Sequence, residues 1–180
     1  MQEQLVSSAW KRLFDLAAAV GGLLVLSPLL VLTALAVKLT SPGPVLFCQE
    51  RVGRGGRPFR ILKFRTMVAD AERRGLRITA GGDPRVTPVG RLLRRYKLDE
   101  LPQLWNVAVG EMSLVGPRPE RPELIARFRE DWRGYMLRTH VKAGITGWAQ
   151  VNGLRGPTSL RKRLQYDLFY IRHWSIWFDV

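Results

Sequence analysis

The sequence predicts an α+β fold in which an apolar helical segment is followed by one β-hairpin and several short amphipathic helices. The helical segment is an uncharged run of 22 residues, 16–37. The hairpin is predicted by two extended apolar stretches that flank a glycine-rich turn between residues 45 and 64. Farther along, apolar residues recur at the three- and four-residue spacing of one helix face. The 180 residues, 46% of them hydrophobic, exclude a disordered chain and suffice for a buried core.

The uncharged run is long enough to cross a membrane, since a straight helix of this length extends ~33 Å. Ser27 and Pro28 lie in its middle, and Pro28 predicts a kink or break because it lacks an amide hydrogen and crowds the preceding turn. Basic residues flank both ends, Lys11 before and Lys38 after, so the positive-inside rule assigns no sidedness. The residues alone leave two arrangements open: a re-entrant helix–break–helix hairpin and a kinked helix that spans the bilayer.

Two further interpretations of the run are less consistent with the residues. A cleaved signal peptide would have an apolar region of only ~7–15 residues, followed by a small-residue cleavage site. The residues that follow here are Lys38-Leu-Thr-Ser-Pro42. A helix buried in the core of a soluble protein is disfavoured because no polar face interrupts the run.

The remaining elements follow from local patterns in chain order. Residues 40–44 form a linker, because two prolines and a glycine stop the preceding helix. A later helix is expected to begin near Asp99 and to end at Gly110, because Pro102 is tolerated only in a first helical turn. The other expectations are hairpin strands at 45–52 and 57–64, a short polar helix at 68–75, a loop at 78–85, a basic helix at 89–96, a loop at 113–119, an amphipathic helix at 121–136, a loop with a short strand at 143–155, and a helix at 158–169.

The charge balance points to anionic partners. The chain has 29 basic and 15 acidic residues, a net charge of +14, and 23 of the basic residues are arginines. Nucleic acid, an acidic membrane surface and phosphorylated substrates all fit this surplus, and the planar fork of arginine favours phosphate. A high-GC genome would also raise the arginine content, so only arginines at defined positions are informative. The single cysteine, Cys48, excludes an internal disulfide, and two histidines are too few for a Cys/His zinc cluster.

Asp99 and Glu100 are the main candidates for chemistry. Ionised carboxylates bind Mg²⁺, and an ionised aspartate can attack phosphorus to form an acyl-phosphate. At a helix N-terminus both carboxylates are expected to stay ionised. The alternative is a helix cap followed by a first-turn glutamate, which the same residue types would form. Arg94 precedes the pair and Arg118 follows it in a rigid Gly-Pro-Arg-Pro loop, and a phosphoryl-transfer site requires such cations.

Other polar residues have both a functional and a structural interpretation. Lys63 and Arg65 alternate with Phe64 and are expected on one face of the second strand, where they would also protect an edge strand from aggregation. Asp167 is a third carboxylate on the last predicted helix, where a solvated surface residue is the ordinary alternative. The aromatic residues near the C-terminus fit either an interfacial belt or core packing, and they are Tyr166, Tyr170, Trp174 and Trp177.

A set of motifs occurs in order from about residue 10 to 179. They are Lys11-Arg12-Leu-Phe-Asp15, Ser27-Pro28, Ser41-Pro-Gly-Pro44, Gln49-Glu-Arg-Val-Gly53, Lys63-Phe-Arg-Thr-Met67, Leu98-Asp-Glu-Leu-Pro-Gln-Leu-Trp-Asn106, Met112-Ser-Leu-Val-Gly-Pro-Arg-Pro-Glu120, Gly144-Ile-Thr-Gly147, and Asp167 with Tyr170. In this order they resemble the small monotopic phosphoglycosyl transferases, the bacterial sugar transferases that load a phosphosugar onto a polyprenyl phosphate. Each motif alone is weak, whereas the ordered set is highly specific.

The resemblance implies a re-entrant membrane helix over residues 1–39, broken at Ser27-Pro28, and a catalytic domain over 40–180. The two parts would form one unit, monotopic on the cytoplasmic face of a bacterial inner membrane, with short amphipathic helices around an active site at the membrane surface. Asp99 is implied to be the nucleophile and Glu100 its partner, the two together holding Mg²⁺. The substrate- and phosphate-binding positions that the resemblance implies are Lys63, Arg65, Arg94, Arg118, Arg155, Asp167 and Tyr170.

The reaction implied by the resemblance is ping-pong. Asp99 attacks the β-phosphorus of a UDP-sugar, UMP leaves, and polyprenyl (undecaprenyl) phosphate then takes the phosphosugar from Asp99. The product would be the first membrane intermediate of a bacterial glycan: exopolysaccharide, O-antigen, capsule or glycoprotein. Inner-membrane lipids are a further implied partner and nucleic acid is not. The oligomeric state stays open, a homodimer included. The sequence does not name the sugar, which residues 73–85 and 153–157 are expected to select.

Two other classes of function remain alternatives. A membrane-tethered module that binds nucleic acid or anionic lipid would use the basic surplus and leave Asp99 and Glu100 as a helix cap. Its signature would be steeply salt-dependent binding without UMP release. The other alternative is a catalytically silent membrane scaffold. The intact Asp99-Glu100 pair within the ordered motifs favours the enzyme over both.

Overall fold

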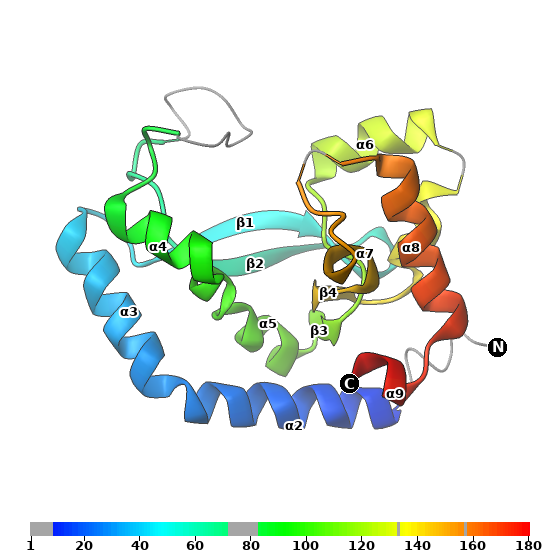
Figure 1. Ribbon diagram of the computed structural model, residues 1–180, viewed down its shortest axis with the longest axis horizontal. Coiled ribbons are helices and arrows are strands. Elements are labelled where there is room, and N and C mark those ends of the chain that lie inside the picture. Colours follow the sequence, from blue (N-terminus) through cyan, green and yellow to red (C-terminus); the bar gives the residue numbers. More distant parts are fainter. Residues whose placement is uncertain (1–8, 72–82, 133, 157) are drawn as a thin grey trace.

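Helices α2 and α3 form a bent pair, and the rest of the molecule packs on the inner side of the bend (Figure 1). This computed structural model describes residues 9–71, 83–132, 134–156 and 158–180. Figure 1 shows the β-hairpin crossing the middle of the molecule, with α4 and α5 between it and the helix pair. The later helices α6, α7 and α8 gather at the opposite end of the hairpin from α3. The fold is therefore α+β, as the sequence predicts.

Helices α2 (Ala9–Val25) and α3 (Ser27–Thr40) meet at a bend of 63°. Pro28 lies in the first turn of α3, where its missing amide hydrogen is not required. Because Pro28 has no amide hydrogen, the carbonyl oxygen of Leu24 lacks its usual helical donor. The Ser27 hydroxyl donates to that oxygen instead, at 2.8 Å. The break predicted at Ser27-Pro28 is confirmed. Among the described residues neither helix alone is long and apolar enough to cross a bilayer, whereas the two together pass that test of length and composition.

The face of α2 that packs against the protein is polar at its start. Lys11, Asp15 and Ala19 are buried and recur every four residues, which places them on one stripe of the helix. The outward faces of α2 and α3 are apolar and exposed, through Trp10, Leu13, Val20, Leu24, Val25, Leu29, Val31, Leu32, Leu35 and Leu39. Ordinary amphipathic helices expose their polar side to water. Here an apolar surface is exposed on the side away from the body, while the inward side also buries apolar residues such as Ala19 and Val37.

Strands β1 (Leu46–Val52) and β2 (Pro58–Phe64) form the predicted antiparallel hairpin, with Leu46 opposite Phe64. The turn η1 (Arg54–Gly56) uses two residues at positive φ, Gly55 and Gly56, a conformation that glycine adopts without strain. The hairpin buries Ile61 and Phe64 and exposes alternate residues of β1.

Helix α4 (Pro88–Tyr96) confirms the expected basic helix, and the hydroxyl of Thr87 caps it by accepting from the Gly90 amide at 2.9 Å. The helix expected from Asp99 is wrong at its start. Lys97 adopts the left-handed conformation (φ 60°), and a single 3₁₀ turn, η2 (Leu98–Glu100), follows it. Helix α5 begins only after Pro102, spans Gln103–Val109, and ends at Gly110 as predicted.

The second half of the chain contains one pair of parallel strands, of which the sequence predicts only the second, as the short strand within residues 143–155. Strand β3 (Met112–Val115) occupies the start of the expected loop at 113–119 and pairs in parallel with β4 (Ala143–Thr146). The single helix expected at 121–136 is interrupted after Asp131, because Trp132 is extended. The chain divides there into α6 (Pro122–Asp131) and the 3₁₀ helix η3 (Tyr135–His140), which Gly134 precedes at a left-handed φ of 81°. The remaining helices are α7 (Trp148–Val151), α8 (Leu160–His173) and α9 (Ile176–Asp179).

One core cluster joins four elements below the hairpin. Ala19 of α2, Ile61 of β2, Val107 of α5 and Met112 of β3 are each at most 3% exposed and pack together. Burial of these side chains couples the helix pair to the strand that carries Lys63. Half of the polar helix expected at 68–75 falls outside the described residues, and residues 69–71 form a turn.

Candidate active site

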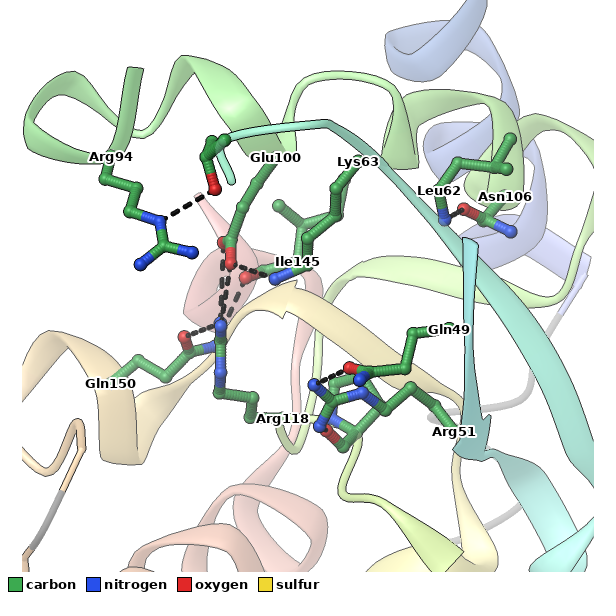
Figure 2. Close-up of polar contacts among 12 residues, drawn as sticks. Gln49, Arg51, Leu62, Lys63, Arg94, Glu100, Asn106, Arg118, Ile145 and Gln150 are labelled. Carbon is green, nitrogen blue, oxygen red and sulfur yellow. Dashed lines mark hydrogen bonds and ion pairs between the residues drawn. The ribbon is translucent and has the colours of Figure 1, made fainter. Parts of the chain in front are cut away.

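Glu100 is the centre of an ion-pair cluster formed by elements far apart in the sequence. Its Oε1 accepts from Lys63 Nζ and from Arg118 Nη2, each at 2.7 Å, and Oε2 lies 3.4 Å from Arg118 Nη1. Lys63 comes from β2, Glu100 from η2 and Arg118 from the loop after β3. Figure 2 shows Lys63 and Arg118 converging on the carboxylate of Glu100. The tertiary structure thus brings three predicted site residues into direct contact.

Arg118 is held on its other side by Gln150 of α7, whose Oε1 accepts from Nη1 at 2.9 Å (Figure 2). Gln150 Nε2 in turn donates to the Ile145 carbonyl at 3.2 Å, so the amide is anchored to β4. Gln150 is not among the site residues that the sequence predicts, and its local pattern contains no signal for this role. The side chain of Arg118 remains 37% exposed, which leaves part of its guanidinium available to a ligand.

Asp99 has a different environment from its neighbour. The residue is 9% exposed, and within the described structure its Oδ1 has no hydrogen-bond partner. Burial raises the pKa of Asp99 above its ordinary value, the charge of Lys63 opposes that rise, and the charge of Glu100 adds to it. Asp99 lies in a buried 3₁₀ turn and not at the N-terminus of an α-helix, so the helix-terminus effect that was expected to favour its ionised form is replaced by an environment that raises its pKa.

Glu100 fits the expectation of an ionised carboxylate. Burial by itself would raise its pKa, but the hydrogen bonds and charges of Arg118 and Lys63 outweigh burial and lower the pKa to about 2. The pKa of Lys63 is lowered by burial, which the charge of Glu100 only partly offsets. Two adjacent carboxylates thus differ sharply: one is locked in ion pairs, and the other is desolvated with a free oxygen.

Arg94 and Arg155 border the cluster. Arg94 of α4 donates from Nε to Thr66 Oγ1 at 2.8 Å, and its charge lowers the pKa of Asp99. Arg155 is exposed and donates from Nε to the backbone oxygen of Gln150 at 3.1 Å, beside the residue that holds Arg118. Both positions suit contacts with an anionic ligand at the rim of the cluster.

Arg65, Tyr170 and Asp167 are predicted site residues whose described contacts lie outside the ion-pair cluster of Glu100. Arg65 is buried and donates from Nη2 to the backbone and side-chain oxygens of Ser41, both at 2.7 Å. The hydroxyl of Tyr170 donates to the Val115 carbonyl at 3.0 Å and lies 2.8 Å from Asp179 Oδ1.

Asp167 is not the solvated helix residue that its position on α8 first suggests. Its side chain is 3% exposed and forms an ion pair with Arg138 at 2.7 Å.

Asn106 is a second residue that the sequence analysis did not single out as functional. Its Oδ1 accepts from the Leu62 amide at 3.0 Å, as Figure 2 shows, and its Nδ2 donates to the Arg60 carbonyl at 2.8 Å. These bonds fix β2 against α5 one residue before Lys63. A polar side chain between the apolar residues Trp105 and Val107 in the middle of α5 was the available signal.

The carboxylate oxygens of Asp99 and Glu100 are of the kind that a hard divalent cation binds, provided that water or substrate oxygens complete its coordination. Among the described residues no group of three or more His, Cys, Asp or Glu side chains forms a metal cage. Mg²⁺, however, is commonly bound by one or two carboxylates together with water and substrate phosphates. The unpartnered Oδ1 of Asp99, next to Glu100, supplies such an oxygen.

Comparison with known proteins identifies the family. The family model for bacterial sugar transferases matches residues 6–180. The chain is 50% identical over 179 residues to the UDP-glucose:undecaprenyl-phosphate glucose-1-phosphate transferase of Escherichia coli (strain K12), covering 97% of this chain and 39% of that protein. It is 53% identical over 178 residues to the undecaprenyl-phosphate glucose phosphotransferase of Komagataeibacter xylinus, covering 94% of this chain and 34% of that protein.

A third relative carries a different sugar in its name. The UDP-N-acetylgalactosamine-undecaprenyl-phosphate N-acetylgalactosaminephosphotransferase of Aeromonas hydrophila is 46% identical over 172 residues, with 94% of this chain and 41% of that protein covered. The chain thus spans only between 34% and 41% of the length of these three relatives. The match over nearly all of its residues shows that the chain belongs to the bacterial sugar transferase family, as its ordered motifs indicate.

Proposed function

We propose that this protein is a phosphoglycosyl transferase that moves a sugar-1-phosphate from a UDP-sugar to polyprenyl phosphate. Family membership and the names of the relatives support the reaction class. The single observation that carries the mechanism is the pairing of a desolvated Asp99, with one free carboxylate oxygen, and a Glu100 locked between Lys63 and Arg118.

In the first step Asp99 attacks the β-phosphorus of the UDP-sugar. A bond forms between a carboxylate oxygen of Asp99 and that phosphorus, and the bond from the phosphorus to the oxygen of the α-phosphate breaks. UMP leaves with the electron pair, and the phosphosugar remains on Asp99 as an acyl-phosphate. Arg118, which bonds Glu100, and Arg94, whose charge acts on Asp99, would stabilise the charge of the transferring phosphoryl oxygens.

In the second step a phosphate oxygen of polyprenyl phosphate attacks the same phosphorus. The acyl-phosphate bond breaks, Asp99 is restored as a carboxylate, and polyprenyl-diphosphosugar is released. The acceptor oxygen is already ionised at neutral pH, so no strong general base is required. This agrees with an ion-pair cluster in which Glu100 is engaged by two cations.

Asp99 and Glu100 would hold Mg²⁺ together with oxygens of the UDP-sugar. When bound, the ion would neutralise negative charge on the diphosphate and so ease the approach of the anionic carboxylate. The residues of the chain do the rest: Lys63 keeps Glu100 ionised and in place, and Arg118 is available to a phosphate through the exposed part of its side chain.

We further propose that α2 and α3 form a re-entrant hairpin in the cytoplasmic leaflet of the inner membrane. Their outward apolar faces and the 63° bend support this placement. Such a hairpin would hold the body of the protein at the level of the lipid phosphates, where the head of the acceptor lies. The net charge of +14 would strengthen the attachment to anionic lipid by ~1 kcal/mol for each cation near the surface.

The decisive experiment is intact-mass spectrometry of the protein incubated with Mg²⁺ and a panel of UDP-sugars, without acceptor. One sugar is expected to release UMP and to leave the chain heavier by one phosphosugar. Asp99→Asn should show neither event, because the amide is not a nucleophile toward phosphorus. Asp131→Asn, an exposed position on α6, is the matched control and should behave as the unsubstituted chain. Near-normal turnover in Asp99→Asn would contradict the assigned nucleophile.

A further inference from the structure

We propose that Asp167 and Arg138 act together as positioning residues for Arg118, without touching the substrate. The proposal rests on the proposed function, since it gives these residues a part in phosphosugar transfer. It also replaces the substrate-binding role that resemblance implies for Asp167. Arg118 is carried by the loop Gly116-Pro-Arg-Pro-Glu120, and the position of its side chain depends on how this loop is held in place.

The two side chains form a buried ion pair directly behind this loop. Arg138 Nη2 lies 2.7 Å and Nε 3.0 Å from Asp167 Oδ2, and each side chain is 3% exposed. The same Nη2 donates to the backbone oxygen of Arg118 at 2.9 Å, and Nη1 donates to the Tyr135 hydroxyl at 2.7 Å. Arg138 therefore links a carboxylate on α8 to the main chain of the residue that grips Glu100.

The chemistry of the loop explains why a side-chain donor is needed. Pro117 and Pro119 have no amide hydrogen, so the backbone is anchored mainly through its carbonyl oxygens. Four consecutive carbonyls, of residues 117–120, each have a donor. Pro117 accepts from the Gly144 amide at 3.0 Å and Glu120 from the Val52 amide at 2.9 Å.

The two middle carbonyls of the loop depend on arginine. Arg118 accepts from Arg138 at 2.9 Å, and Pro119 accepts from Arg51 Nη1 at 3.2 Å. A buried guanidinium is costly without a carboxylate partner. Glu120 of the loop lies 3.8 Å from Arg138 Nη1, but Asp167 is the carboxylate that accepts a hydrogen bond from Arg138, at 3.0 Å from Nε, and is therefore the main group that holds Arg138 in this position. Removal of either partner should let the backbone at Arg118 shift, and a displacement of about 1 Å in a catalytic group can cost about 100-fold in rate.

The test compares Asp167→Asn and Arg138→Lys with Tyr135→Phe. The control also removes one buried hydrogen bond from Arg138 but leaves the link to the loop intact. Hydrogen exchange at the Val52 and Gly144 amides reports the loop directly, because they donate to the Glu120 and Pro117 carbonyls. Exchange at both amides is expected to accelerate in the two test variants and to stay unchanged in Tyr135→Phe. Unchanged exchange in Asp167→Asn would overturn the proposal.

Kinetics provide the second readout. A positioning role predicts that Asp167→Asn lowers kcat for UMP release by about 100-fold with little change in KM, because the interaction lost is one with the transition state. A rise in KM at unchanged kcat would instead assign Asp167 to substrate binding. A wild-type protein that released no UMP from any UDP-sugar would refute the proposed function, and the exchange experiment would still decide whether these residues hold the loop.

A double variant separates positioning from simple stability. Asp167→Leu with Arg138→Met removes both buried charges together, so thermal stability should return toward that of the unsubstituted chain. The Arg118 carbonyl would still lack its donor, so kcat should stay low. Recovery of kcat in parallel with stability would show that the ion pair is merely structural and would overturn the proposal.

Discussion

At the scale of single residues, the contrast between Asp99 and Glu100 is set by their partners. Glu100 is satisfied by Lys63 and Arg118, and its pKa falls to about 2. Asp99 is buried with an unpartnered oxygen, and its pKa rises. A locked carboxylate is suited to organise cations, whereas a desolvated one is suited to attack phosphorus. Adjacent residues of similar chemistry can therefore take different roles.

This contrast predicts the effect of Lys63→Met on the pH dependence of the reaction. The charge of Lys63 favours ionised Asp99, so its removal should raise the pKa of Asp99 further. As the proposed nucleophile, Asp99 must be ionised to react, so the acid limb of the pH–rate profile for UMP release should move to higher pH. Lys162→Met on α8 is the control and should leave the limb in place. An unmoved acid limb in Lys63→Met would show that another group governs it.

At the scale of elements, the approach of α4 to the hairpin depends on Gly90. A Cβ built at Gly90 would lie 2.1 Å from the Thr66 carbonyl oxygen, which belongs to the backbone and cannot swing away. Arg94, one turn later on α4, bonds the Thr66 hydroxyl. The absence of a side chain at Gly90 thus allows α4 to lie close to Thr66, in the segment that follows β2.

Gly90→Ala is therefore expected to destabilise the protein by about 1–3 kcal/mol despite the better helix propensity of alanine. The activity should fall with stability, because α4 carries Arg94. The matched control is Gly21→Ala in α2, where a Cβ meets nothing within 4 Å and the propensity gain should appear alone. Chemical denaturation measures the free energy of unfolding of both variants. Equal changes in Gly90→Ala and Gly21→Ala would show that close packing at Gly90 does not determine stability.

The break between α2 and α3 depends on Pro28, which lies in the first turn of α3. Pro28→Ala restores an amide donor and allows one continuous helix long enough to span a bilayer. In a Cys48→Ser background, cysteines at positions 9 and 57 should react with a membrane-impermeant reagent from the same side. Pro28→Ala should move part of the population to labelling from opposite sides. Labelling of positions 9 and 57 from opposite sides in the chain that retains Pro28 would instead establish a helix that spans the bilayer.

At the scale of the whole molecule, the two ends of the described chain are joined by a buried polar clasp. Asp179 of α9 accepts from Lys11 of α2 and from Trp174 Nε1, the latter at 3.0 Å. Lys11 is also 3.7 Å from Asp15, whose Oδ1 accepts from the Leu114 amide at 3.1 Å. The clasp ties the apolar helix pair to β3, and the Arg118 loop follows that strand.

Asp179→Ala should reduce the free energy of unfolding by about 3 kcal/mol, because one partner of a buried ion pair is removed while the other stays. Asp131→Ala removes an exposed carboxylate from α6 and should change stability little. Thermal unfolding of both variants in the same lipid or detergent measures the difference. A similar small change in both would show that the clasp contributes nothing to the fold.

The sequence by itself was enough for features that depend on local chemistry. Pro28 predicts the break because a missing amide hydrogen acts within one helical turn, and Gly110 predicts the end of α5 for a similarly local reason. The hairpin follows from strand propensity and turn glycines. The ordered motifs were enough for the family, and they named Asp99, Glu100, Lys63 and Arg118.

Only the tertiary structure decided how those residues differ. Burial raises the pKa of both Asp99 and Glu100, and it is the hydrogen bonds and charges of Arg118 and Lys63 on Glu100 that separate the two values. No local pattern contains these distant partners. The role of Gln150 and the partnership of Arg138 with Asp167 join residues 32 and 29 positions apart. Contacts of this kind arise when elements pack, since their free energy comes from excluding water between surfaces that the chain order does not place together.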